Sequence, residues 1–194
     1  MLNAPVASLE VYPKAPLVEV VFEMRFPGEP VVECHRDDLF DFVRGRMPIV
    51  QVPELSSPDH FKFRTYKYSS VDGGSSILAG LNQMGYSCKK YEGFERFKSE
   101  LTPIFLFFIK RFKIRDLRRF GFRYVNAIPF VRENGNLPLK KYFQSTFKIS
   151  PSLPDELQHC GLSFVQSVAA GSVITKIETL QKNTTGQDFA AHQN

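Results

Sequence analysis

Hydrophobic and polar positions alternate with a period of two near the start of the chain, which predicts a β-strand with one buried face. The side chains on the apolar face are Val18, Val20, Phe22, Met24 and Phe26. The other face carries Glu19, Glu23 and Arg25, together with Val21. Pro16 before this segment and Pro27-Gly28 after it predict where the strand begins and ends.

Two segments show apolar residues at steps of three and four, as expected for helices that lie on a sheet. The first, residues 37–47, has an apolar stripe of Leu39, Phe40, Phe42 and Val43. The second, residues 94–112, places its apolar side chains at Phe94, Phe97, Leu101, Ile104, Phe105, Phe108, Ile109 and Phe112. A proline inside a helix costs about 3 kcal/mol, so at Pro103 we expect either a kink near Glu100 or the start of a second segment.

The remaining alternating segments predict a hairpin and a closing strand. Residues 60–70 and 76–90 flank Val71-Asp72-Gly73-Gly74, a strong signal for a tight turn. Phe120, Phe122 and Tyr124 alternate with Gly121, Arg123 and Val125 in a strand that ends near Pro129, and we expect these aromatic rings on the sheet face under the helices. The order of elements predicts an α+β fold over residues 14–131: a ferredoxin-like βαββαβ antiparallel sheet with two helices on one face.

Residues 141–180 predict a partial second βαββ unit. It comprises a strand over 143–149, a short helix over 154–160, a strand over 162–169, a turn at Gly171-Ser172 and a strand over 173–179. The polar segment 181–194 is expected to be a disordered tail. A sheet that lacks its last strand leaves an edge that is covered or recruits a partner. A shortened gene explains the missing elements equally well.

The composition suits a protein with a phenylalanine-rich core. Of 194 residues 43% are hydrophobic, with nineteen Phe, seven Tyr and no Trp. The three cysteines, Cys34, Cys88 and Cys160, are far apart and odd in number, which favours neither a disulfide framework nor a zinc site. The chain opens without a basic leader and long apolar run, and its densest apolar stretch is too short to span a bilayer. We therefore expect a cytoplasmic protein with no membrane contact.

The positive charge is concentrated in one segment, residues 110–123, here called the basic elbow. The net charge of the chain is +5 and its pI is about 9.1. The elbow holds the single acid Asp116 and seven cations: Lys110, Arg111, Lys113, Arg115, Arg118, Arg119 and Arg123. These cations could bind phosphates while Tyr66, Tyr68, Tyr86 and Tyr91 stack on bases. They are also compatible with a solvated connection, since cations near a helix C-terminus favour the helix dipole.

No pattern predicts catalysis, a cofactor or a metal. Adjacent residues of an extended segment point to opposite sides, so Cys34 and His35 are not expected to form a catalytic pair, and Asp37 or Asp38 fits a helix N-cap or first-turn acid. His35, His60, His159 and His192 are isolated, without metal-ligand spacing. Asp72-Gly73-Gly74 lacks the Lys and Ser/Thr of a phosphate loop. RFGFRYV differs from an RNA-recognition motif by falling on the fourth strand and by having Arg119 in place of a glycine.

Three segments together resemble an uncharacterised, sporadically distributed prokaryotic protein family: YPKAPLVEVVFEMRFP, GYSCKKYEGFERFKSELTPIFLFFIK and RRFGFRYVNAI. The matching positions are Pro16, Val18, Glu19, Tyr91, Phe94, Gly121, Arg123, Tyr124, Val125 and Asn126. The resemblance covers about residues 10–165, and family members continue past the end of this chain into a further strand. It implies no activity, but the patchy occurrence of the family is suggestive of defence-associated gene neighbourhoods.

The sequence thus predicts a non-enzymatic interaction or assembly component, in a bacterial defence or toxin-neutralising setting. It would bind a partner protein, or a second copy of itself, through a sheet edge and the basic elbow. The alternative is a nucleic-acid-binding protein that uses the same cations with exposed tyrosines.

Overall fold

The computed structural model describes residues 16–52, 65–129, 131, 161–169 and 171–179. The chain divides into two compact units, residues 1–128 and 129–194. The strand expected over 143–149, the helix over 154–160 and the tail over 181–194 lie outside the described residues, as do Cys160, His60, His159 and His192.

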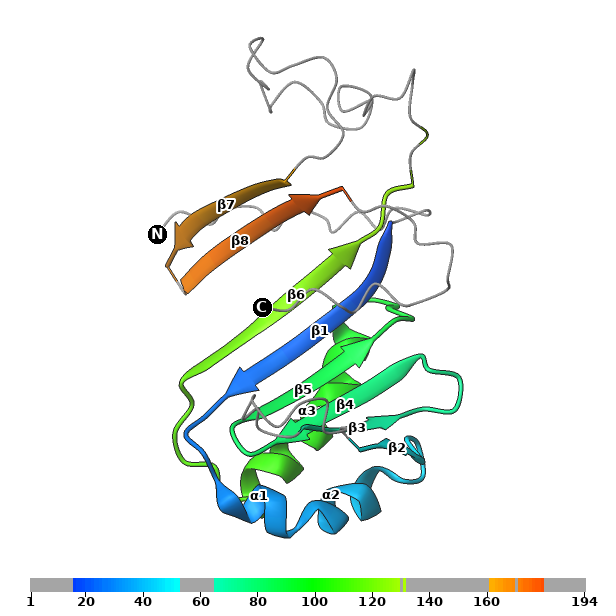
Figure 1. Cartoon of the computed structure of the whole chain (residues 1–194), viewed down its shortest axis with the longest axis vertical. Helices are drawn as coiled ribbons and strands as arrows, with labels where there is room; N and C mark the ends of the chain where they lie inside the picture. Colours follow the sequence, from blue (N-terminus) through cyan, green and yellow to red (C-terminus); the bar gives the residue numbers. More distant parts are fainter. Residues whose placement is uncertain (1–15, 53–64, 130, 132–160, 170, 180–194) are drawn as a thin grey trace, which may run out of the picture. The chain divides into compact units, whose positions relative to one another are not determined.

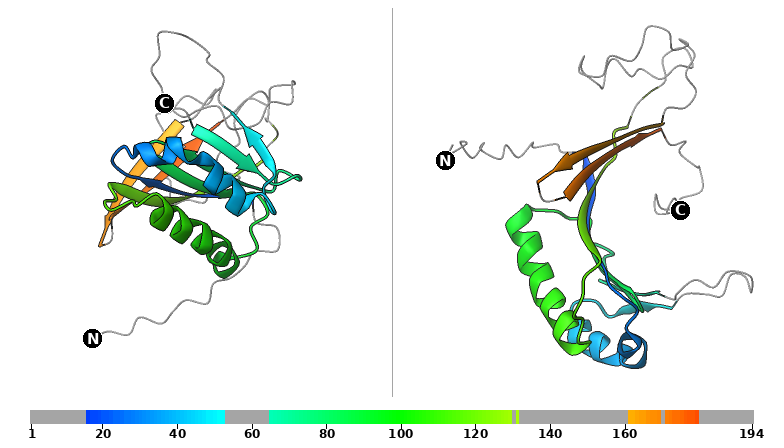
Figure 2. Two further views of the ribbon diagram at one scale, coloured as in Figure 1. Left: turned by 90° about the horizontal axis from the view of Figure 1, so that it is seen from below. Right: turned by 90° about the vertical axis from the view of Figure 1, so that its left-hand side faces the viewer.

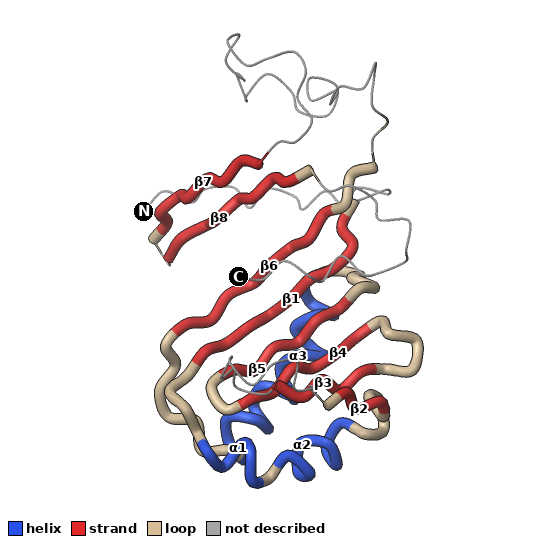
Figure 3. The backbone as a smooth tube through the Cα atoms, in the orientation of Figure 1, coloured by secondary structure: helices blue, strands red, loops and turns tan. Residues whose placement is uncertain are grey.

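The first unit is a mixed α+β structure built on one antiparallel sheet. Its elements are β1 (Leu17–Arg25), α1 (Pro30–Cys34), α2 (Arg36–Val43), β2 (Ile49–Gln51), β3 (Thr65–Ser69), β4 (Ser75–Gly80), β5 (Gln83–Cys88), α3 (Phe94–Arg111) and β6 (Arg119–Asn126). The six strands lie in the order β2-β3-β4-β5-β1-β6, as Figures 1 and 3 show. All neighbouring strands are antiparallel. Among the described strands, the sheet therefore ends in β2 on one side and β6 on the other.

β1 organises this sheet because it lies between β5 and β6 and alternates as expected. Val20 and Met24 are fully buried, and Phe22 faces Tyr86 of β5 and Phe122 of β6 in the register of the ladder. Val18, which was predicted on the buried face, is 42% exposed. The pairing register with β6 shifts between Leu17 and Glu19, beside this residue.

The segment predicted as one strand over residues 76–90 is in fact two strands, β4 and β5. They reverse at Leu81-Asn82, and Gly80 pairs with Gln83. Backbone contacts from the end of β1 hold this turn: Phe26 N–H donates to the Asn82 carbonyl at 3.1 Å, and Glu29 N–H donates to the Leu81 carbonyl at 2.8 Å. The reversal thus depends on a tertiary contact that the local pattern does not show. The short strand β2 was also missed.

α3 covers one face of the sheet, as the edge-on view in Figure 2 shows. Phe97, Leu101, Ile104 and Phe108 are buried along it, and Phe112 is buried just after it. The helix continues through Pro103, so the expectation of a second segment is wrong. Pro103 lies on the exposed side of the helix. None of the helices in the described ranges is long and apolar enough to cross a membrane.

The two short helices complete the same core. α1 contributes Val32, while α2 contributes Leu39 and Val43. Phe42 of α2 stacks on Phe107 of α3, with ring centroids 4.1 Å apart and planes nearly parallel. The predicted helix over 37–47 is therefore shorter than expected and is preceded by a separate helical turn.

The second unit contains one described hairpin, formed by β7 (Gly161–Val168) and β8 (Gly171–Glu178). The register runs from Gly161 opposite Glu178 to Val168 opposite Gly171. Gly171 has a φ of 146°, a backbone conformation that residues other than glycine rarely adopt. The two strands predicted for this region are confirmed.

Candidate functional site

An exposed aromatic row lies on β6, the strand at one end of the sheet. Phe120, Phe122 and Tyr124 pair with Met24, Phe22 and Val20 of β1, and so point to the same side as these core residues. They are nevertheless 65%, 43% and 48% exposed. The prediction that they lie under the helices is therefore wrong in burial, although their side of the sheet is as expected.

The ring contacts from α3 reach this row at its middle residue, Phe122. Phe94 and Phe97 each lie 6.1 Å from Phe122 between ring centroids. Phe22 supports the same ring from β1 at 5.3 Å. No described strand pairs with the outer side of β6. The rings are therefore fixed by neighbouring residues but open to solvent on the outer side.

Tyr91 and Tyr124 extend the row toward the start of α3. Their rings meet edge to face at 6.1 Å. Burial, with a smaller contribution from the nearby Tyr124 hydroxyl, raises the pKa of Tyr91 to about 12. The aromatic surface is defined from here on as Phe94, Phe120, Phe122 and Tyr124, all exposed large side chains.

The basic elbow spans the last residues of α3, the connection after it and the first residues of β6. Lys113 has a φ of 54°, in the left-handed region, which turns the chain out of the helix. Ile114 N–H donates to the Ile109 carbonyl at 3.1 Å, and Arg118 N–H donates to the Arg25 carbonyl at 2.8 Å. The elbow is therefore hydrogen-bonded to α3 at its start and to β1 at its end.

Arg111, one of the seven predicted binding cations, forms an ion pair with a residue of another helix. Arg111 donates to Asp38 of α2 at 2.5 Å, and both side chains are about one third exposed. This ion pair joins the end of α3 to α2. Arg111 is thus held toward α2.

The other elbow cations are exposed. Five of them form no ion pair within the part of the chain that the structure describes: Lys110, Lys113, Arg115, Arg118 and Arg119. By contrast, many basic residues elsewhere in the first unit are paired with acids, namely Arg25, Arg36, Arg44, Lys90 and Arg96. The elbow is therefore a local excess of uncompensated positive charge beside the aromatic surface.

The arginines of β6 lie on the face opposite the aromatic rings. Arg119 and Arg123 alternate with Phe120, Phe122 and Tyr124 along the strand. Arg119 lies directly opposite Arg25 of β1. Glu23 accepts a hydrogen bond from Arg25 at 2.8 Å and offsets only one of these two charges. One strand thus presents aromatic rings on one side and cations on the other.

Two of the four tyrosines proposed to stack on bases are buried. Tyr68 is 2% exposed and Tyr86 is 1% exposed, so their expected role on the surface is wrong. Tyr86 donates to Glu100 at 2.7 Å, and burial, followed by this bond, raises its pKa well above the usual value. Tyr66 is partly exposed, with the Arg36 guanidinium 4.1 Å from its ring centroid.

The structure brings together one group that the sequence did not predict. The donor atoms of His35, Asp37 and Asp38 lie within 4.8 Å of one another, near the junction of α1 and α2. Cys34 also lies at this helical junction and not in the extended segment expected. However, Asp38 Oδ2 already accepts a hydrogen bond from Arg111 at 2.5 Å. His35 Nδ1 lies 3.6 Å from the same oxygen. The Arg111 guanidinium therefore competes directly with any metal ion for Asp38.

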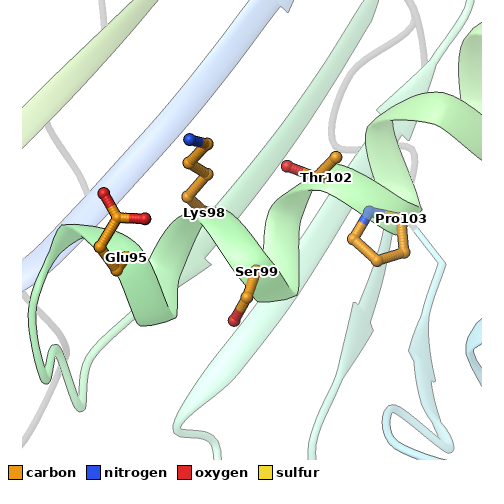
Figure 4. A pocket seen from close by; sticks show the side chains of 5 residues that line it. All are labelled: Glu95, Lys98, Ser99, Thr102 and Pro103. Atoms are coloured by element: carbon orange, nitrogen blue, oxygen red, sulfur yellow. The ribbon is translucent and has the colours of Figure 1, made fainter.

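Shallow depressions mark the described part of the surface, and two of them are well defined by their lining residues. The first, about 350 Å³, lies along the outer side of α3 and is lined by Glu95, Lys98, Ser99, Thr102 and Pro103 (Figure 4). All five residues are exposed, and the Ser99 hydroxyl donates to the Arg96 carbonyl at 2.7 Å. The second, about 380 Å³, lies between residues 26–31 and 113–116. Its charged lining residues are Glu29, Lys113, Arg115 and Asp116, a mixture that suits no single ligand charge.

No protein-family model, curated protein or solved structure matches the chain. The resemblance noted in the sequence remains a prediction. The fold and its surface therefore define an α+β protein whose sheet ends in an aromatic edge strand beside a basic elbow.

Proposed function

We propose that the protein is a non-enzymatic interaction or assembly component that binds a partner protein through the edge of β6 and the basic elbow. The observation that carries this proposal is the exposure of Phe120, Phe122 and Tyr124 on an edge strand. Edge strands offer backbone groups for pairing, and native proteins usually protect them with charge, proline or a covering element. Exposed aromatic residues and arginines are also the types that contribute most to protein interfaces.

The opposite edge of the sheet offers less to a partner. β2 has three residues, whereas β6 has eight. A longer edge provides more backbone donors and acceptors and a longer row of side chains. β6 is therefore the better candidate of the two.

The elbow cations favour a second candidate, a nucleic-acid-binding protein. The burial of Tyr68 and Tyr86 and the separation of rings and arginines on opposite faces of β6 argue against it. Polyanion binding should weaken by several decades between low and moderate salt if it is real. Loss of such binding in the Arg115/Arg118/Arg119→Ala variant would support this second candidate.

We further propose a ferredoxin-like core for the first unit and a cytoplasmic, defence-associated or toxin-neutralising setting. Strands β4-β5-β1-β6 have the order and directions of a βαββαβ sheet, to which β3 and β2 are added at one side. Cys34 and Cys88 are free thiols, as is usual in a reducing compartment.

Site-specific photocrosslinking in the source cells tests the proposed function. A photoreactive amino acid at Phe120 should give a discrete protein adduct, because this exposed ring lies within the proposed interface. The same amino acid at Val71, which is 78% exposed on the turn between β3 and β4, serves as the control. Equal adducts at both positions, or adducts to nucleic acid alone, would contradict the proposal.

A further inference from the structure

We propose that the partner contributes an extended segment in which apolar and acidic residues alternate, and that this segment adds to the edge of β6 as a further strand. The inference rests on the proposed function and names the chemistry of the partner. It follows from the two faces of β6, which differ in character.

The first step concerns the backbone. β6 has a described neighbour, β1, on one side only. A peptide that adds to such an edge gains main-chain hydrogen bonds, while its alternate side chains contact the two faces of the sheet. The occupant of this edge is therefore expected to be extended.

The second step concerns the face that carries the rings. Phe120, Phe122 and Tyr124 follow one another at every second position, so their spacing matches that of same-face residues on an added strand. Phe94 from α3 borders Phe122 on this face. Apolar side chains at alternate positions of the partner would cover this row and remove it from water.

The third step concerns the opposite face. Arg119 lies directly opposite Arg25, and like charges in this arrangement are unfavourable. Glu23 is hydrogen-bonded to Arg25 and leaves Arg119 without an acid in the described part of the chain. An acidic residue next to Arg119 on an added strand would offset this charge. Arg118 and Arg115 extend the positive field beyond the start of β6.

Charge also distinguishes this partner from a second copy of the chain. Two copies that paired through β6 about a two-fold axis perpendicular to the sheet would place Arg119 of both strands on the same face. The chain also carries a net charge of +5. Self-pairing would therefore increase the repulsion that an acidic partner removes.

A binding titration with synthetic peptides tests this inference. The probe is a fluorescent peptide of eight residues, the length of β6, in which valine and glutamate alternate. The matched control has the same eight-residue length and composition, but its four valines and four glutamates stand in separate blocks. We expect the alternating peptide to bind at least about tenfold tighter, a factor that anisotropy measures readily. Equal affinity would overturn the inference, because charge alone would then explain binding.

Variants of the full chain locate the contact. Arg119→Glu and Phe122→Ala should each weaken binding of the alternating peptide by about tenfold or more. Lys89→Glu and Val71→Ala change exposed residues outside the elbow and β6, and should leave binding unchanged. Circular dichroism of each variant establishes that the fold is retained. A loss of binding in the Lys89 variant equal to that in the Arg119 variant would overturn the assignment to β6.

The remaining outcomes distinguish the proposed partner strand from nucleic acid and from a second copy of the chain as the occupant of the β6 edge. Full competition by a double-stranded oligonucleotide, with no preference for the alternating peptide, would favour nucleic acid and overturn the inference. A stable dimer that excludes the peptide would favour self-pairing and overturn it too. If Phe120 gives protein adducts in cells but the alternating peptide shows no preference, the strand chemistry fails while the proposed function stands. Without adducts and without peptide binding, both fail.

Discussion

The burial and the pKa of a single side chain in this protein depend on the residues packed around it. Tyr68 is buried against the helical layer, and its hydroxyl lies 3.5 Å from the Arg36 carbonyl, to which it donates. Burial is the main cause that raises its pKa from 10.0 to about 12. The neutral phenol is therefore favoured in the folded state.

This shift predicts a loss of stability in alkali. The pKa of Tyr68 is higher in the folded than in the unfolded state. Its contribution to the free energy of unfolding is therefore fully present below pH 10 and is lost as the pH rises toward about 12. The loss should amount to about 2 to 3 kcal/mol, given about 1.4 kcal/mol per pKa unit. Urea unfolding of the wild type and Tyr68→Phe between these pH values measures it. Equal losses in both proteins would contradict the burial of this hydroxyl.

The cations of the elbow illustrate what a sequence can predict at the residue scale. The sequence shows seven positive side chains within residues 110–123 but not which of them have partners. Asp38 lies far from Arg111 in the chain, and only the packing of α2 beside α3 brings the two together. All of these side chains except Arg111 are exposed in the structure, whereas the ion pair of Arg111 depends on tertiary structure.

At the scale of elements, α3 divides the phenylalanines into those that stabilise the fold and those left at the surface. Phe108 is fully buried in the core, whereas Phe122 is 43% exposed at the sheet edge. Phe108 belongs to α3 and is buried in the core, whereas Phe122 belongs to β6 and lies on the same side of the sheet as the core residue Phe22. Phe122 stays partly exposed on a strand that has a described neighbour on one side only.

Truncation of these two rings should therefore have different costs. Phe108→Ala is expected to lower the free energy of unfolding by about 3 to 5 kcal/mol, as is usual for a buried phenylalanine. Phe122→Ala should cost less than half as much, because part of its ring already contacts water. Chemical denaturation of both variants measures the difference. Equal costs would mean that Phe122 is a core residue and that the aromatic surface is misassigned.

The elements that the sequence predicted well have strong and local patterns. β1 and β6 alternate over most of their length, and α3 has eight apolar positions at helical spacing over residues 94–112. The failures have tertiary causes. The reversal at Leu81-Asn82 is held by backbone contacts from the segment after β1, and nothing in the residues 76–90 marks it strongly. Period-two alternation shows which side a ring takes, but not whether a helix covers it.

At the scale of the whole molecule, charge and apolar surface coincide at one end of the sheet. Many basic residues of the first unit outside the elbow are paired with acids, while five elbow cations are not paired within the described residues. The exposed rings of β6 lie beside them in the chain. This combination is unfavourable in isolation, and we propose that an acidic, partly apolar strand of a partner covers it.

Backbone hydrogen exchange in the full chain, with and without the alternating valine-glutamate peptide, tests the central claim most directly. Strand addition should slow exchange of amides within β6, residues 119–126, because their outward groups become hydrogen-bonded. β2, residues 49–51 at the other end of the sheet, provides the internal control and should be unchanged. Slower exchange across β6 alone is the predicted result. Protection confined to β2 or to residues 110–118 of the elbow, with β6 unaffected, would contradict the account.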